Sequence, residues 1–203
     1  MGQRQSSSFY GSDEDILLFA LCILFFDNHP DENGDEINKN KKLAGKVKGL
    51  LMKKEDVIKE IESAFLGVSL GNGIGLWEAQ AIDDYESKEV QLKNRRRDEK
   101  DNWRLLTYTE LQRCHSSLSF FDADGMRFHL PAYIIASLNN KVDDPIFHLT
   151  QLDDYAKSKL TTINNTQKQA IITYLKWCLE QCEYEFEHTA ISKALSKYWQ
   201  MSI

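Results

Sequence analysis

The pattern of apolar and polar positions predicts a largely helical chain. Residues 53–65 repeat apolar side chains at helical spacing, and residues 76–85 do the same after a glycine-rich stretch. A long helix is expected from Asn165 or Thr166, where a polar side chain can cap the first turn. A last helix is expected from about Glu187.

One stretch, Leu118–Leu138 (LSFFDADGMRFHLPAYIIASL), predicts an antiparallel hairpin. Asp124-Gly125 favours a two-residue type I′ turn, because both central residues of that turn take positive φ. One face of the hairpin is then almost entirely apolar; it carries Ser119, Phe121, Ala123, Met126, Phe128 and Leu130. The other face carries Leu118, Phe120, Asp122, Arg127 and His129, with Asp122 opposite Arg127 and Phe120 opposite His129. Pro131 suits the first turn of a following helix.

A single hairpin is marginal in water, so further cover is expected for it. The short apolar stretch Ile146–Thr150 (IFHLT) is a candidate third strand. The predicted fold class is therefore mostly α with a small β part, an α+β fold. Its helices would pack around an antiparallel hairpin or a three-stranded sheet.

The first 51 residues differ from the rest and are predicted to be an amino-terminal extension. They combine an apolar helix over residues 13–26 with a charged linker over residues 27–48. The apolar run Ile16–Phe26 is shorter than the roughly 20 residues that span a bilayer. Acidic residues precede the run, unlike the basic flank of a signal peptide. A buried helix is favoured over a membrane-seeking segment, and residues 52–203 are predicted to form a single α+β domain.

Charge and composition narrow the function classes. The chain has 203 residues, of which 42% are hydrophobic and 28% are charged, with a net charge of -6. An acidic balance argues against nucleic acid as the main partner, since phosphate contacts need a basic face. The same balance suits binding to a basic protein surface. We expect another protein as partner, no nucleic acid and no stable membrane span.

The cysteines predict neither a disulfide framework nor a metal site. Of the four, Cys178 and Cys182 lie four residues apart on one helical face, but no second Cys or His pair at zinc spacing accompanies them. No cofactor and no metal are expected. A reducing compartment, the cytoplasm, is the expected location.

Two charged or glycine-rich segments have ordinary structural interpretations. The sequence GVSLGNGIG at residues 67–75 fits neither nucleotide-binding glycine pattern, so it is expected to be a flexible connection. The arginines at residues 95–97 are flanked by acids and are expected at an exposed helix end.

The carboxylates of Glu78, Asp83 and Asp84 lie within two turns of the predicted helix 76–85. They could serve acid–base chemistry or form a solvated face, and Asp84 could pair with Lys88.

Four segments, LWEAQAIDDYE, DEKDNW, LSFFDADGMRFHLPAYI and FHLT, together resemble a bacterial domain-of-unknown-function family, family 6714. The resemblance implies a shared E-A-x-x-I-D-D-Y helix, a later tryptophan and a core close to LSFxDxxGxRFxLPAY. It would cover about residues 53–200 and implies no activity, cofactor or catalytic residue. It draws attention to eight positions: Glu78, Asp83, Asp84, Trp103, Asp122, Gly125, Arg127 and Pro131.

Two function classes remain open, and binding is favoured over catalysis. The first is a small acidic protein-binding module, for instance an inhibitor or immunity-type protein that covers a basic surface. Its candidate binding residues are Glu78, Asp83, Asp84, Trp103, Asp122, Arg127 and His129. The alternative is an enzyme in which Arg127 holds an anionic substrate and His129 moves a proton, together with carboxylates of residues 76–85. A simple surface pair between Asp122 and Arg127 would account for those side chains without any chemistry.

Overall fold

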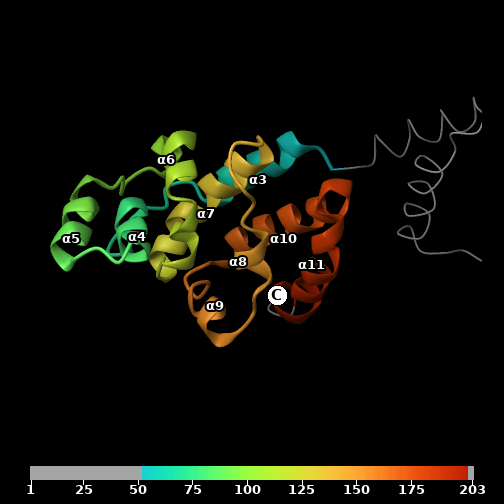
Figure 1. Ribbon diagram of the computed structural model, residues 1–203. Helices are drawn as coiled ribbons and strands as arrows, with labels where there is room; N and C mark the ends of the chain where they lie inside the picture. Colours follow the sequence, from blue (N-terminus) through green and yellow to red (C-terminus); the bar gives the residue numbers. More distant parts are fainter. Residues whose placement is uncertain (1–51, 201–203) are drawn as a thin grey trace, which may run out of the picture. The chain divides into compact units, whose positions relative to one another are not determined.

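The computed structural model describes residues 52–200, and within that range the chain forms helices and no strand (Figure 1). The prediction of an α+β fold is therefore wrong; this part of the chain is all-helical. The longer helices are α3 (Lys54–Ala64), α4 (Leu76–Asp83), α5 (Lys88–Arg97), α7 (Ala123–Leu138) and α10 (Asn165–Leu179). The shorter ones are α6 (Tyr108–Arg113), α8 (Ile146–Thr150), α9 (Asp154–Ser158) and α11 (His188–Ala194). Short 3-10 segments, η1 (Trp103–Leu105), η2 (His115–Ser119) and η3 (Cys182–Glu187), and a short π-helical segment, η4 (Leu195–Trp199), complete the described unit.

Helix α7 forms the middle of the core. Every side chain from Phe128 to Ile134 is buried, so this helix has no solvent-facing stripe in that stretch. Helix α3 and turn η1 pack against α7, and α10 packs against α3. Helices α4 and α5 pack together at one end of the described unit, and α10 and α11 lie at the other (Figure 1).

The predicted hairpin is instead the start of α7. Asp122 is the N-cap residue: its Oδ1 accepts hydrogen bonds from the N–H of Gly125 at 2.8 Å and of Ile74 at 3.0 Å. Asp124 and Gly125 thus lie in the first helical turn, where an acidic residue is favourable because it faces the positive end of the helix dipole. The Asp124-Gly125 pair, which predicted a hairpin turn, therefore lies just inside a helix that Asp122 caps.

Because residues 118–138 form no hairpin, the predicted pairs of facing side chains are also wrong. Phe121 stacks on the ring of His129 rather than facing Phe128, and Arg127 pairs with Asp124 at 3.4 Å rather than with Asp122. The expected burial is nevertheless confirmed, because Phe121, Met126, Phe128 and Leu130 are all in the core. A helix that is apolar on all sides lacks the 3.6-residue period that would distinguish it from a strand.

Two neighbouring predictions are corrected in the same way. Pro131 lies inside α7, eight residues after its first residue, and not in the first turn of a new helix. The expected third strand is the short helix α8, which Asp144 helps to start because its Oδ1 accepts the N–H of Ile146 at 2.9 Å.

Several helix predictions are confirmed. Helices α3, α4 and α10 lie where the spacing placed them, and the buried side of α10 includes Ala170, Ile171, Tyr174, Leu175 and Cys178. Residues 67–75 form the connection between α3 and α4. One detail differs: α4 ends at Asp83, and Tyr85, the last residue of the predicted helix 76–85, is 97% exposed.

Long-range hydrogen bonds tie distant segments of the unit together. The indole N–H of Trp199 donates to the carbonyl of Leu149 at 2.9 Å, which fixes η4 on α8. The N–H of Met52 donates to Oε2 of Glu180 at 3.1 Å, which joins the start of the unit to the end of α10. The predicted helix 13–26 and the linker lie outside the described residues, so the division at residue 51 stays a prediction. No helix between residues 52 and 200 has the length and hydrophobicity needed to cross a membrane.

Candidate functional site

Glu78, a predicted site residue, belongs to a polar junction beneath the loop at residues 71–75. Its Oε2 accepts hydrogen bonds from the N–H of Gly75 at 3.2 Å and from Nη1 of Arg95 at 3.0 Å. The same guanidinium donates to the carbonyls of Gly71 and Gly73. Both charged side chains are largely buried, with 22% of Arg95 and 15% of Glu78 exposed. The pair therefore fixes the glycine loop to α5.

Asp98 completes this junction from the other side. It follows α5 directly, and its carboxylate accepts the N–H of Trp77 at 2.8 Å and of Glu78 at 3.2 Å. It caps the first turn of α4, whose own N-cap residue, Gly75, has no side chain to do so. Burial raises the pKa of Asp98, while the two backbone N–H donors counteract part of that effect.

Asp122 has a capping role and joins the junction to α7. Through its bond to the N–H of Ile74 it holds the glycine loop against the first turn of α7. The approach is close: a Cβ on Gly125 would lie 2.6 Å from the carbonyl oxygen of Ile74, and one on Gly73 would lie 2.5 Å from the nitrogen of Gly125. Glycine is required at both positions because backbone meets backbone there.

His129 is sealed inside the core. It has no exposed surface, and its Nδ1 lies 2.7 Å from the carbonyl oxygen of Gly125, so that nitrogen carries the proton and donates it. Its Nε2 is buried and has no hydrogen-bond partner among residues 52–200. Burial lowers the pKa of His129 to about 4. The imidazole therefore lies out of reach of substrate in this conformation.

Arg127 and Trp103 lie apart from His129. Arg127 precedes His129 by two residues on α7, so the two side chains leave the helix in different directions. Its guanidinium pairs with Asp124, a partly exposed contact one turn away. Trp103 is buried in η1, where its indole N–H donates to the carbonyl of Phe65 at 2.8 Å. These positions do not bring Arg127, His129 and the α4 carboxylates into a shared cleft.

Asp83, which is half-buried, and Asp84, which is exposed, differ from the other predicted residues because no distant segment of the described unit is bonded to them. Their carboxylates accept hydrogen bonds only from Nε2 of Gln80 among the described side chains, at 3.4 and 3.1 Å. The expected pair between Asp84 and Lys88 is not formed; Lys88 donates to Oε1 of Gln91 at 2.8 Å. Together with the exposed residues Tyr85 and Glu86 they form an acidic end of α4, which we name the α4 tip (Asp83–Glu86).

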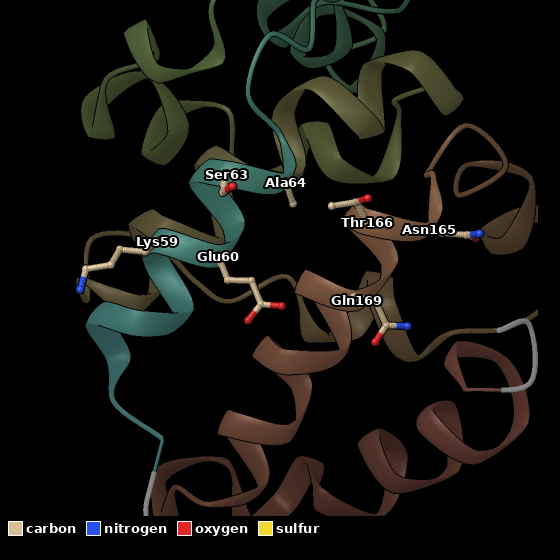
Figure 2. A pocket seen from close by; sticks show the side chains of 7 residues that line it. All are labelled: Lys59, Glu60, Ser63, Ala64, Asn165, Thr166 and Gln169. Carbon is tan, nitrogen blue, oxygen red and sulfur yellow. The ribbon is translucent and has the colours of Figure 1, made fainter.

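The hollows on the surface of the described unit include three that are lined by residues of several helices. The largest of these three lies between α3 and α10, where Figure 2 shows Glu60 reaching into the gap and Lys59 pointing away from it. Glu60 accepts a hydrogen bond from the hydroxyl of Thr173 at 3.0 Å across this gap, and Lys59 pairs with Asp56 on the exposed side of α3. The remaining lining residues are Ser63, Ala64, Asn165, Thr166 and Gln169.

The other two hollows differ in polarity. One is mainly apolar and borders η1, α6 and α7; it includes Trp103, Tyr108, Leu111 and Ile135. The other is acidic and lies beyond the C-terminal end of α7. Of the seven predicted site residues, only Trp103 lines any of these three hollows. No group of three or more His, Cys, Asp or Glu side chains in this part of the chain is placed to hold a metal ion.

The sequence interpretation missed Arg95 and Asp98. Both belong to a dense charge run that reads as an exposed helix end, and most of that run, including Arg96 and Arg97, is indeed exposed. The start of α4 could have indicated a role for Asp98. A helix whose N-cap residue is glycine needs a side chain from another segment to accept hydrogen bonds from its first N–H groups.

Comparison with known proteins identifies a family and no activity. A family model described as "Family of unknown function (DUF6714)" matches residues 53–203. No curated protein and no solved structure matches the chain. The match begins at residue 53, one residue after Met52, the first described residue.

Proposed function

The chain belongs to the family of unknown function DUF6714, and from that premise we propose that it is a protein-binding module whose contact surface is the α4 tip. The observation that carries the proposal is Tyr85. Its ring is 97% exposed, although tyrosine is a large side chain with an apolar body. Exposed aromatic side chains are enriched at the centres of protein interfaces, where they contribute much of the binding energy.

The backbone at Tyr85 strengthens this interpretation. Its φ is +55°, a left-handed conformation that glycine adopts readily and that side chains with a Cβ disfavour. The turn that ends α4 requires this φ: the N–H of Glu86 donates to the carbonyl of Ala81 at 2.9 Å, and that of Tyr85 donates to Ile82 at 3.1 Å. Tyrosine in a glycine position, pointing into water, adds nothing to the fold and is best explained by contact with a partner.

The charge of the α4 tip indicates the kind of partner. Asp83, Asp84 and Glu86 are next to Tyr85 in the sequence, and none of them forms an ion pair with a lysine or arginine within residues 52–200. A basic protein surface would supply the missing positive charge. An inhibitor or immunity-type protein that covers a basic toxin surface is the concrete version that we favour.

The structure supports binding better than the alternative enzyme. Catalysis by Arg127 and His129 would require both side chains to meet a substrate next to an α4 carboxylate. His129 is instead enclosed by the core, and Glu78 is occupied by Arg95 and the glycine loop. The side chains that could take part in catalysis therefore stabilise the fold, whereas those of the α4 tip do not.

Two finer proposals accompany this function. We propose that bacterial members of the family share the motifs E-A-x-x-I-D-D-Y and LSFxDxxGxRFxLPAY. An alignment of family members tests this proposal, which fails if positions 83–85 vary freely.

We also propose that the protein works in the cytoplasm. The support is that Cys114, Cys178 and Cys182 are all free thiols.

The test uses the full chain and the purified products of neighbouring genes. Association is measured by surface plasmon resonance at low and high salt. We expect one product to bind, with an association rate that falls as salt rises and falls again in Asp83→Lys/Asp84→Lys. The matched control is Glu55→Lys/Asp56→Lys, which makes the same charge change on the exposed side of α3 and should bind as wild type.

A cellular readout at equal protein level separates binding from catalysis. The proposal requires the α4 tip variant to lose function while Arg127→Ala and His129→Ala keep it, apart from packing effects. The opposite pattern, with Arg127→Ala or His129→Ala inactive and the tip variant normal, would replace the binding function by the enzyme.

A further inference from the structure

The mainly apolar hollow that borders η1, α6 and α7 has the size and lining of a small-molecule site. Its volume is about 410 Å³, within the roughly 300–1,000 Å³ of typical ligand pockets. Such pockets hold the apolar body of a ligand, and a few polar groups determine its orientation. We call it the η1–α7 hollow. Its apolar wall consists of aromatic and aliphatic side chains: Trp103, Leu106, Tyr108, Leu111, Ala132 and Ile135.

Two opposite charges line the same hollow, and neither is neutralised. Glu62 belongs to the last turn of α3, and Arg104 belongs to η1. The two side chains do not pair with each other, and neither forms an ion pair with any other side chain between residues 52 and 200. The η1–α7 hollow therefore has one negative and one positive group beside an apolar wall.

Arg104 is held in place by contacts that leave its charge available. Its Nη2 donates to the backbone carbonyl of Glu62 at 2.8 Å, and its guanidinium carbon lies 4.9 Å from the ring centroid of Trp103. A guanidinium has five N–H donors in a fork that matches the two oxygens of a carboxylate, and most of them stay free here. Because these contacts already position the guanidinium, less side-chain entropy is lost when a carboxylate binds.

The end of α3 favours a positive group in the same way. The carboxylate of Glu62 lies in the last turn of this 11-residue helix, and that turn has no basic residue. The C-terminal end of a helix carries the negative end of its dipole, which attracts cations. An ammonium group beside Glu62 would therefore meet two negative features that no described side chain balances.

We propose that the η1–α7 hollow binds a free amino acid with a large apolar side chain. The carboxylate of the amino acid pairs with Arg104, its ammonium pairs with Glu62, and its side chain lies against the apolar wall. One small zwitterion thus satisfies both charges and the wall together. The inference goes beyond the proposed function, because no residue of the α4 tip lines this hollow.

The competing occupant is an apolar side chain of a partner protein, and the charges disfavour it. A residue inside a peptide chain has neither a free ammonium nor a free carboxylate next to its side chain. It would cover Glu62 and Arg104 without pairing either of them, which costs binding energy. A small molecule with only one charge would leave one of the two side chains unpaired.

The experiment is an NMR titration of the full chain with L-phenylalanine, followed by backbone amide signals. Three control ligands each lack one feature: phenethylamine lacks the carboxylate, hydrocinnamate lacks the ammonium, and L-serine lacks the apolar side chain. We expect saturable shifts at residues 103–111 and 132–135 with L-phenylalanine, and binding weaker by about fivefold or more with each control. Shifts in other parts of the chain, no shifts, or equal binding of any control would overturn the proposal.

Two variants assign the charges. Arg104→Gln should weaken L-phenylalanine binding by about fivefold or more, but should not weaken phenethylamine binding, because that ligand has no carboxylate. Glu62→Gln should weaken L-phenylalanine binding by a similar factor and should not weaken hydrocinnamate binding. The matched controls Arg113→Gln on α6 and Glu55→Gln on α3 make the same charge changes at exposed positions outside the hollow and should bind as wild type. A variant that weakens all ligands equally, or none, would reject the pair assigned to it.

The neutral probe acetyl-L-phenylalaninamide tests the protein occupant. It has the same apolar side chain, with both charges replaced by amides as in a peptide chain. We expect it to bind more weakly than L-phenylalanine by about tenfold or more, because it pairs with neither charged side chain. If it binds as tightly as L-phenylalanine, the hollow accepts an apolar side chain of a protein, and the amino acid site is rejected.

Discussion

The imidazole of His129 lies flat against the ring of Phe121, with the ring centroids 4.2 Å apart and the planes 5° from parallel. The stack lies in the core, where His129 is fully buried and Phe121 is 2% exposed. Burial in this position keeps the histidine neutral. Protonation would place a positive charge in an apolar environment, on a ring whose Nε2 has no hydrogen-bond partner. A residue that resembles a catalytic base in the sequence is thus a core residue with a lowered pKa.

We expect the free energy of unfolding to fall as the pH drops from about 6.5 to about 4. His129 has a folded-state pKa of about 4, against 6.5 for an unperturbed histidine, so the unfolded chain binds its proton first and stability declines through this window. The loss from this residue is about 3 kcal/mol when complete. His148, with a pKa lowered to about 4 by burial, acts in the same direction. Asp98 and Asp144, with raised pKa values, oppose it because the folded state takes up their protons first.

Urea denaturation at a series of pH values measures this dependence. His129→Phe keeps the stack and removes the titrating group, so its stability curve should be flatter between pH 6.5 and 4. A variant curve with the same slope as wild type would show that another group is responsible.

Arg95→Ala should destabilise the unit by about 2–4 kcal/mol, because it leaves Glu78 and two loop carbonyls without their donor in a largely buried place. Chemical denaturation measures the loss. Arg96→Ala is the matched control: it removes the same side chain from the exposed neighbouring position and should change stability by no more than about 0.5 kcal/mol. Equal effects of the two variants would show that the junction contributes little.

Gly125→Ala should destabilise the protein, although glycine-to-alanine changes inside helices usually stabilise. The added Cβ would lie 2.6 Å from the carbonyl oxygen of Ile74, a backbone atom that cannot rotate away. We expect a cost of about 1–3 kcal/mol, as for other overpacked sites. Thermal unfolding followed by circular dichroism measures it, and an increase in melting temperature would contradict the close approach of the glycine loop to α7.

Tyr85→Gly should separate stability from binding. Glycine relieves the positive φ at this position, so stability should stay equal or rise by up to about 1 kcal/mol. Partner binding should be lost, because the exposed ring is removed. Both quantities are measured on the same protein sample, by denaturation and by surface plasmon resonance. A destabilised variant that still binds would refute the role assigned to Tyr85.

A chain that begins at Met52 should fold by itself and unfold cooperatively. Its core is closed by contacts internal to residues 52–200, including the hydrogen bond from Met52 to Glu180 and that from Trp199 to Leu149. Denaturation curves of the full and shortened chains provide the comparison. A shortened chain without a cooperative transition would place Ile16–Phe26 in the core instead.

The sequence alone determined the amphipathic helices and much of the core. Residues 53–65 and the helix from Asn165 have one apolar side, so their periodicity follows from the geometry of a helix on the surface of a core. Burial of Phe121 and Phe128 was also predictable, because large apolar side chains leave water in either secondary structure. These properties depend on local pattern and hydrophobicity, which a sequence displays directly.

Only the tertiary structure decided the form of Leu118–Leu138 and the roles of the polar residues. Helix α7 is surrounded by the rest of the unit, so its sequence has no period, and the Asp124-Gly125 pair fits a hairpin turn as well as a capped helix start. The choice follows from Asp122, which bonds Ile74 from a segment 48 residues earlier. Likewise, Arg95 and Asp98 act on the glycine loop and α4 across about 20 residues of chain. A charged side chain can be solvated, can cap a helix or can bind a partner, and which of these occurs depends on the distant backbone segment that packs beside it. The local sequence pattern does not contain that information.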